Sequence, residues 1–172
     1  MKQSAALPLT TVVLRILIIL NWLYGAGIFA LLLLSITHEQ WTFTSLGVPP
    51  SPDNESLVVG MRAIAVLGLV AVPLSYIVLK WLLALVDTVR KGDPFIAINA
   101  HRLQTIAWVL LASQMLSVVI GAIGKSISTP AYPLHLDAGF SPSGWLAVLL
   151  TFVLARVFGQ GTLMRNDLEG TV

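Results

Sequence analysis

Long apolar runs separated by short polar stretches dominate the chain. The four runs cover about residues 12–35, 57–86, 103–123 and 144–158, and the second has an uncharged centre at 63–79. About 20 helical residues cross a hydrocarbon core of about 30 Å. The runs are continuous and do not alternate with polar positions, as strands of a membrane barrel would. The pattern therefore predicts an all-α protein with four membrane-spanning helices.

The amino-acid composition agrees with a membrane protein. Hydrophobic residues make up 56% of the chain and charged residues only 10%, whereas a soluble domain carries about 25% charged residues. The 172 residues fit one membrane domain. A net charge of +2 argues against direct nucleic-acid binding through a broad basic face. The absence of cysteine excludes disulfides, iron–sulfur clusters and thiol catalysis.

Basic residues are distributed unevenly between the two sides that four spans define. With the N-terminus in the cytoplasm, only Arg62 and Lys125 lie on the outer side. The inner side then holds Lys2, Arg15, Lys80, Arg90, Lys91, Arg102, Arg156 and Arg165. Because cytoplasmic loops of membrane proteins carry an excess of Lys and Arg, this bias predicts that both termini are cytoplasmic. The expected fold is an integral membrane four-helix bundle.

The stretch between the second and third spans, 87–102, is expected to be a cytoplasmic hairpin turn. Gly92 follows a pair of basic residues and is predicted to end the second helix at its C′ position. Asp93 is predicted to cap the next helix, with Pro94 in its first position. The stretch is either a turn anchored at the lipid headgroups or a docking platform for a cytoplasmic partner. The residues alone leave both interpretations open.

Small residues at a spacing of four follow one face of the third and fourth spans. In lipid, such stripes allow close approach of helices, so we expect these two helices to pack together. The amides of Asn21 and Gln114 lie deep in their spans and are expected to form hydrogen bonds across the bundle interior. The residues with a predicted packing role are Asn21, Gly25, Ser113, Gln114, Ser117, Gly121, Ala147, Thr151, Ala155 and Gly159.

The sequence offers little catalytic or cofactor chemistry. No charged residue lies at the middle of a predicted span, which argues against an ion or proton pathway. His38, His101 and His135 lie in predicted loops or at a helix start, so they do not suit a haem held between helices. Their acidic neighbours lack a diagnostic metal-ligand spacing. No Walker loop, HExxH or GxSxG motif occurs. We therefore expect a protein that is not an enzyme and needs no cofactor or metal.

Two stretches of the chain carry a family resemblance. The inner turn reads GDPFIAINAHRLQTI and the C-terminal stretch reads VFGQGTLMRNDLEGTV. They resemble two signature stretches of DUF2975, a bacterial family of four-span membrane proteins. The first family pattern is filled by Gly92, Pro94, Phe95, Asn99, Arg102 and Leu103. The second is filled by Gly161, Arg165, Asp167, Leu168, Glu169, Thr171 and Val172. At Gln104 the chain departs from the second basic residue that the family often has.

The resemblance also implies a function and a location. Members of that family are often encoded beside a small Cro/CI-type helix-turn-helix regulator. This association implies a signalling protein of the bacterial cytoplasmic (inner) membrane that holds or releases such a regulator. The polar tail, 160–172, is expected to leave the membrane and join the turn. The expected docking residues are Arg90, Lys91, Asp93, Pro94, Phe95, Asn99, Arg102, Arg165, Asp167, Leu168 and Glu169.

Two other classes of function stay open beside this one. The chain is either an accessory or structural subunit of a larger membrane complex, or a small transporter or channel. The uncharged midplane argues against the transporter. Self-association into a homo-oligomer also stays open.

Overall fold

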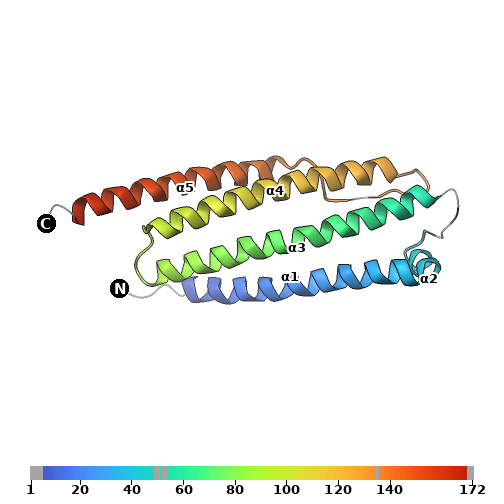
Figure 1. Ribbon diagram of the computed structural model, residues 1–172, viewed down its shortest axis with the longest axis horizontal. Coiled ribbons are helices and arrows are strands. Elements are labelled where there is room, and N and C mark those ends of the chain that lie inside the picture. Colours follow the sequence, from blue (N-terminus) through green and yellow to red (C-terminus); the bar gives the residue numbers. More distant parts are fainter. Residues whose placement is uncertain (1–5, 49–50, 52–53, 135, 170–172) are drawn as a thin grey trace. The chain divides into compact units, whose positions relative to one another are not determined.

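The structure of the chain is a computed structural model (Figure 1). It describes residues 6–48, 51, 54–134 and 136–169, except for the side chains of Ala6 and of 166–169. Regular structure in these ranges consists of five α-helices. They are α1 (Ala6–Thr37), α2 (Glu39–Ser45), α3 (Glu55–Arg90), α4 (Ala97–Ile127) and α5 (Pro142–Glu169). The all-α prediction is confirmed.

Four of these helices are long and apolar enough to cross a membrane. They are α1, α3, α4 and α5, and the predicted runs 12–35, 57–86, 103–123 and 144–158 each lie inside one of them. Only 6% of the most apolar window of α1 is buried. A soluble protein rarely exposes so large an apolar surface, whereas a lipid bilayer covers it. The chain is therefore a multi-pass membrane protein.

The helices extend beyond the apolar runs, and this shortens the polar segments between them. The inner turn was expected at 87–102, but only residues 91–96 lie between α3 and α4. The C-terminal stretch from 160 on was expected to be a polar tail, yet α5 continues through it to Glu169. Hydropathy marks where a helix leaves the apolar layer, whereas backbone hydrogen bonds decide where it ends.

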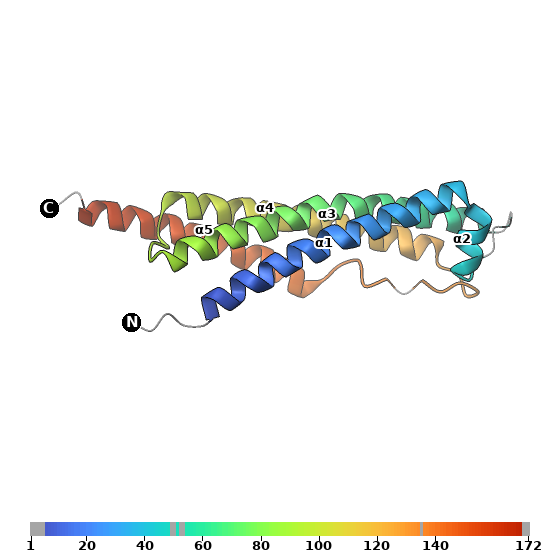
Figure 2. The ribbon, with the colours of Figure 1, turned by 90° about the horizontal axis from the view of Figure 1, so that it is seen from below.

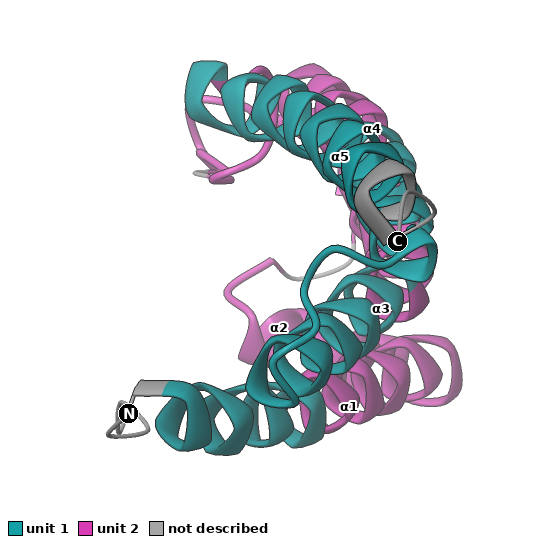
Figure 3. Ribbon diagram, turned by 90° about the vertical axis from the view of Figure 1, so that its left-hand side faces the viewer, with its two compact units in different colours: residues 1–20, 74–112, 142–172 teal, residues 21–73, 113–141 magenta. Residues whose placement is uncertain are grey.

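The chain divides into two compact units, each built from parts of several helices (Figure 3). Among the described residues, unit 1 comprises 6–20, 74–112 and 142–169, and unit 2 comprises the rest. Within α3 the division follows Pro73 directly. Proline lacks the amide hydrogen that continues a helical ladder, so it is a natural point of division in a long helix.

In unit 2, three buried apolar side chains form a small core. These are Val48, Leu57 and Ile127, and Met61, Ile64, Ile123, Tyr132 and Leu134 pack around them. Gly60 lies beneath the core, because a Cβ atom added there would lie 2.6 Å from Ile127. The core joins the start of α3 to the end of α4.

Arg62 holds α2 in place within unit 2. Its guanidinium donates hydrogen bonds to the carbonyl oxygen of Ser35 and, at 2.6 Å, to the carboxylate of Glu39. It also lies 5.6 Å from the ring centroid of Phe43, a side chain that is only 2% exposed. The segment after α1 is therefore a packed cap.

Replacing Arg62 with Met should loosen this cap. The variant keeps an unbranched apolar side chain but removes the hydrogen bonds that the charged guanidinium donates. Because Glu39 is about half exposed, we expect a loss of about 1–2 kcal/mol in unfolding free energy. Thermal unfolding in detergent measures it. Lys125→Met removes an exposed charge from the same unit and is the control. Equal stability of the two variants would contradict the role of Arg62.

A stretch without regular helix, which we call the return segment (residues 136–141), precedes α5 (Figure 2). It lies against the second half of α4 within unit 2. The amide of Gly139 donates to the Ser117 hydroxyl oxygen at 3.1 Å, and that hydroxyl lies 3.4 Å from the Gly139 carbonyl oxygen. A Cβ atom added to Gly121 would lie 2.6 Å from the carbonyl oxygen of Ala138. The small residues of α4 therefore accommodate backbone.

This arrangement corrects the expected partner of the stripe on α4. The fourth span was expected against Ser117 and Gly121, but the return segment lies there. Non-helical backbone close to lipid needs polar partners of its own. The Ser117 hydroxyl meets that need for Gly139.

The other predicted packing residues of unit 2 lie in different surroundings. The Asn21 amide donates to the carbonyl oxygen of Val72 at 3.1 Å, so it joins α1 to α3. Gly25 is buried, and a Cβ atom there would lie 2.9 Å from a Val72 methyl group. Ser113 and Gln114 are both partly buried. Within the described ranges the Oε1 atom of Gln114 has no hydrogen-bond partner.

Candidate functional site

The inner turn of unit 1 begins with a glycine-terminated helix end. Gly92 has φ +84°, and its amide donates to the carbonyl oxygen of Val89 at 3.0 Å. The amide of Asp93 donates to the carbonyl oxygen of Thr88 at 3.2 Å. Together these are the two hydrogen bonds of a Schellman motif. The predicted C′ position of Gly92 is confirmed.

The next helix begins later than the sequence indicates. Helix α4 starts at Ala97, and residues 93–96 are not helical. The prediction that Asp93 caps this helix with Pro94 in its first position was therefore wrong. The carboxylate of Asp93 accepts a hydrogen bond from Arg165, and the carbonyl oxygen of Pro94 accepts one from the Asn99 side chain. These contacts hold the segment extended.

Asn99 is the centre of the turn. Its side chain is 0% exposed, and its amide donates to the Thr88 hydroxyl at 2.7 Å and to the Pro94 carbonyl oxygen at 2.9 Å. The side-chain carbonyl oxygen of Asn99 accepts a hydrogen bond from the Arg102 guanidinium at 3.0 Å. Because the side chain is enclosed, it cannot contact a partner as expected. It fastens α3, the turn and α4 to one another.

Arg102, in the first turns of α4, also connects α4 to α3. Its guanidinium donates to the Ala84 carbonyl oxygen at 3.1 Å and lies 5.8 Å from the ring centroid of Trp81. Lys80 lies 5.5 Å from the same ring. Two residues of the family pattern, Asn99 and Arg102, therefore build the turn. Sequence reasoning missed Trp81 and Thr88, although an aromatic residue beside a basic one is typical of a membrane interface.

The turn and the end of α5 lie together in unit 1. Arg165 forms an ion pair with Asp93, and both side chains are a little under half exposed. The rings of Phe95 and Phe158 have centroids 5.2 Å apart. Gly161 leaves room for Phe95, since a Cβ atom there would lie 2.8 Å from its ring. The two stretches that resemble the family are thus in direct contact.

Four predicted docking residues remain on the surface of this region, together with Ile98, which was not predicted as one of them. We call the set formed by Arg90, Lys91, Phe95, Ile98 and Arg165 the inner-turn surface. All five are exposed, with Phe95 at 43% and Ile98 at 52%. The remaining predicted docking residues, Asp167, Leu168 and Glu169, belong to the last turn of α5, and their side chains lie outside the described residues.

Helices α4 and α5 pack against each other in unit 1. The rings of Trp108 and Phe152 meet edge to face with centroids 5.3 Å apart. A Cβ atom on Gly159 would lie 4.0 Å from the Cβ of Ala100. Of the predicted stripe on α5, Ala155 is buried and Gly159 partly buried. Ala147 is exposed, and the hydroxyl of Thr151 donates to its carbonyl oxygen at 2.7 Å.

The described ranges hold no group of three His, Asp or Glu side chains that could bind a metal ion.

Four apolar helices, two of them joined by a polar turn that side-chain hydrogen bonds hold in place, define a multi-pass helical membrane protein. The family model described as "Protein of unknown function (DUF2975)" matches residues 32–172. The chain therefore belongs to the DUF2975 family, and the resemblance found in the sequence is confirmed. No curated protein and no solved structure matches it.

Proposed function

We propose that the protein is a non-enzymatic signalling protein of the bacterial inner membrane that sequesters a small helix-turn-helix regulator. The observation that carries this proposal is the contact between the two family stretches. The ion pair of Asp93 with Arg165 and the packing of Phe95 on Phe158 join them within unit 1. Two stretches that lie in contact can bind one partner together, whereas two separate stretches could not form a single binding surface.

The inner-turn surface has the composition of a binding surface. Arg90 and Lys91 supply exposed positive charge, and Phe95 and Ile98 supply exposed apolar area beside it. Binding energy in protein interfaces concentrates at aromatic and Arg side chains, and charge complementarity steers association. A regulator that binds DNA keeps a basic face for phosphate. The regulator should therefore bind the inner-turn surface through a different face, one that is acidic and has an apolar pocket.

Replacing Phe95 with Ala should reduce capture of this regulator from a detergent extract. Loss of an aromatic anchor costs about 2 kcal/mol, or about 30-fold in affinity. Tagged full-length protein and the variant are compared by pull-down and identification of the captured proteins. Leu154→Ala, at another exposed apolar residue of unit 1, is the matched control. Equal capture by Phe95→Ala, or a wild-type protein that captures no small regulator, would contradict the proposal.

An accessory subunit of a larger membrane complex is the second candidate. Ala26, Gly27 and Ala30 are exposed on α1, and a Cβ atom at Gly27 would meet nothing within 4 Å. Small exposed residues on a membrane helix favour close approach of another helix. In the same pull-down, this candidate predicts that only membrane proteins are captured, equally by wild type and Phe95→Ala. An Ala30→Leu variant should then lose them.

A further inference from the structure

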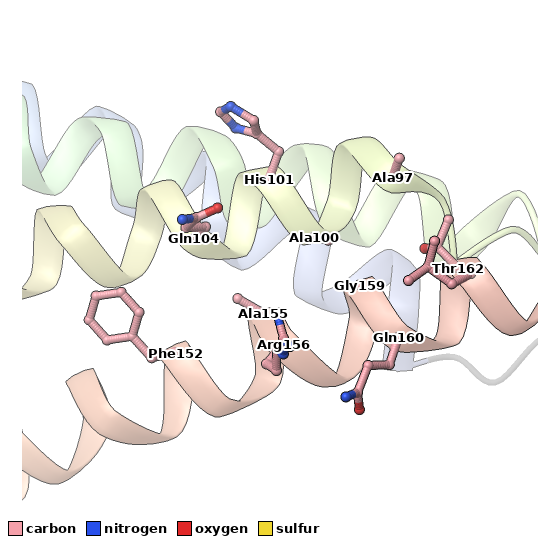
Figure 4. Close-up of a pocket in the computed structure, with 11 residues that line it drawn as sticks. Ala97, Ala100, His101, Gln104, Phe152, Ala155, Arg156, Gly159, Gln160 and Thr162 are labelled. Atoms are coloured by element: carbon pink, nitrogen blue, oxygen red, sulfur yellow. The ribbon is translucent and has the colours of Figure 1, made fainter.

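We propose that a groove between α4 and α5 in unit 1 binds the phosphate-bearing headgroup of an anionic phospholipid. The groove has a volume of about 750 Å³ (Figure 4). Ala100, Ala155 and Gly159 are among its lining residues. Because these side chains are small or absent, the two helices leave space between them that larger side chains would fill.

The polar lining residues lie along both helices. Figure 4 shows His101 and Gln104 on α4 and Arg156 and Gln160 on α5, with His101 and Gln160 at opposite edges. Phe152 points toward α4 and closes one end of the groove. The guanidinium of Arg156 is exposed, so a ligand in the groove can reach it.

The charge of the lining favours an anion. Its polar side chains are the cation Arg156, the imidazole of His101, two Gln amides and Thr162, and no carboxylate is among them. An Arg guanidinium binds phosphate through two parallel hydrogen bonds. The Thr162 hydroxyl is already bonded to the Phe158 carbonyl oxygen at 2.9 Å. We therefore assign the phosphate to Arg156, with the Gln104 amide on α4 as a further donor.

The position of the groove along α4 favours a lipid over a free phosphate. The charged residue Arg102 follows the lining residue His101 in the sequence, and the run from Leu103 to Gly124 carries no charge. A change from charged to apolar residues, with Trp81 beside Arg102, marks the layer of the headgroups. Basic sites between membrane helices on the cytoplasmic side bind anionic headgroups. Exposed Val153 and Val157 on α5 supply apolar surface for the acyl chains.

The test titrates full-length protein in a neutral detergent with phosphatidylglycerol or phosphatidylcholine and counts bound lipids by native mass spectrometry. Wild type should bind phosphatidylglycerol more tightly. Arg156→Gln should weaken that binding about five-fold, the contribution of one cation near an anionic surface. It should weaken phosphatidylcholine binding less, because the choline cation offsets the phosphate charge. Arg15→Gln removes the same charge at an exposed position of unit 1 outside the groove and should bind like wild type.

Three outcomes would overturn the proposal. These are equal binding of the two lipids, an equal loss in Arg15→Gln and Arg156→Gln, and complete displacement of the lipid by excess inorganic phosphate. Gln104→Leu, an exposed position on the other helix, should also weaken phosphatidylglycerol binding. It serves as the second variant if Arg156→Gln melts at a lower temperature. The lipid site does not depend on the proposed function, since neither lipid variant changes the inner-turn surface.

Discussion

Replacing Gly121 with Ala is expected to push the return segment away from α4. The added Cβ atom would lie 2.6 Å from the Ala138 carbonyl oxygen and 2.7 Å from the Gly139 Cα. Both contacts are with backbone, which cannot move aside as the end of a side chain does. Overpacking of this kind costs about 1–3 kcal/mol. Thermal unfolding in detergent should show the loss, and limited proteolysis between residues 128 and 141 should become faster.

Two other glycines provide graded controls for this effect. Gly27→Ala adds the same atom where nothing lies within 4 Å, so the higher helix propensity of Ala should leave stability unchanged or higher. Gly124→Ala would meet the side chain of Leu136, most closely its Cδ1 atom, which can rotate away, so its effect should be intermediate. If Gly121→Ala is as stable as Gly27→Ala, the return segment does not pack on α4.

Replacing Asn99 with Leu is expected to destabilise the inner turn by about 3–5 kcal/mol. Leu has the same branched outline but a larger volume, and it removes the hydrogen bonds of Asn99 to the Thr88 hydroxyl, the Pro94 carbonyl oxygen and the Arg102 guanidinium. The Thr88 hydroxyl and the Arg102 guanidinium keep their hydrogen bonds to the Leu85 and Ala84 carbonyl oxygens. Each lost hydrogen bond costs about 1 kcal/mol, and one to a charged group costs about 1.5–3 kcal/mol. Thermal unfolding of the purified variant measures the total.

Thr88→Val is the matched control for Asn99. It removes one of the three hydrogen bonds and keeps the shape of the side chain, so a loss of about 1 kcal/mol is expected. If Asn99→Leu unfolds at the wild-type temperature, the hydrogen bonds at Asn99 do not hold the turn. Phe95→Ala removes the packing on Phe158, so its unfolding temperature is measured beside its capture of the regulator, and a smaller loss than in Asn99→Leu is expected.

Local chemistry in the sequence predicted local features well. Gly92 was expected to end α3, because a glycine that follows a basic pair can end a helix without any distant contact. Its φ of +84°, in the left-handed region, agrees with this prediction. The cap at Asp93 failed for the opposite reason. Its partner, Arg165, is 72 residues away in the sequence. A pattern within one turn of helix carries no information about such a contact.

The sequence also identified residues without identifying what they touch. The small residues Ser117 and Gly121 were found by their spacing, which indicates close approach of some backbone. Whether that backbone is a helix or the return segment depends on how 128–141 folds, and hydropathy does not specify that. Asn99 and Arg102 were found through the family pattern. Their hydrogen bonds to Pro94 and Ala84 became visible only once the turn was built.

The continuity of α5 has a mechanical consequence. A flexible tail would absorb motion between the membrane and the inner-turn surface, whereas a continuous helix from Pro142 to Glu169 behaves as a lever arm. Its 28 residues are about 42 Å long, so a tilt of about 10° at one end displaces the other by about 7 Å. Phe95 and Asp93 are attached to that arm through Phe158 and Arg165. Bilayer thickness, which sets helix tilt, would thereby act on the geometry of the inner turn.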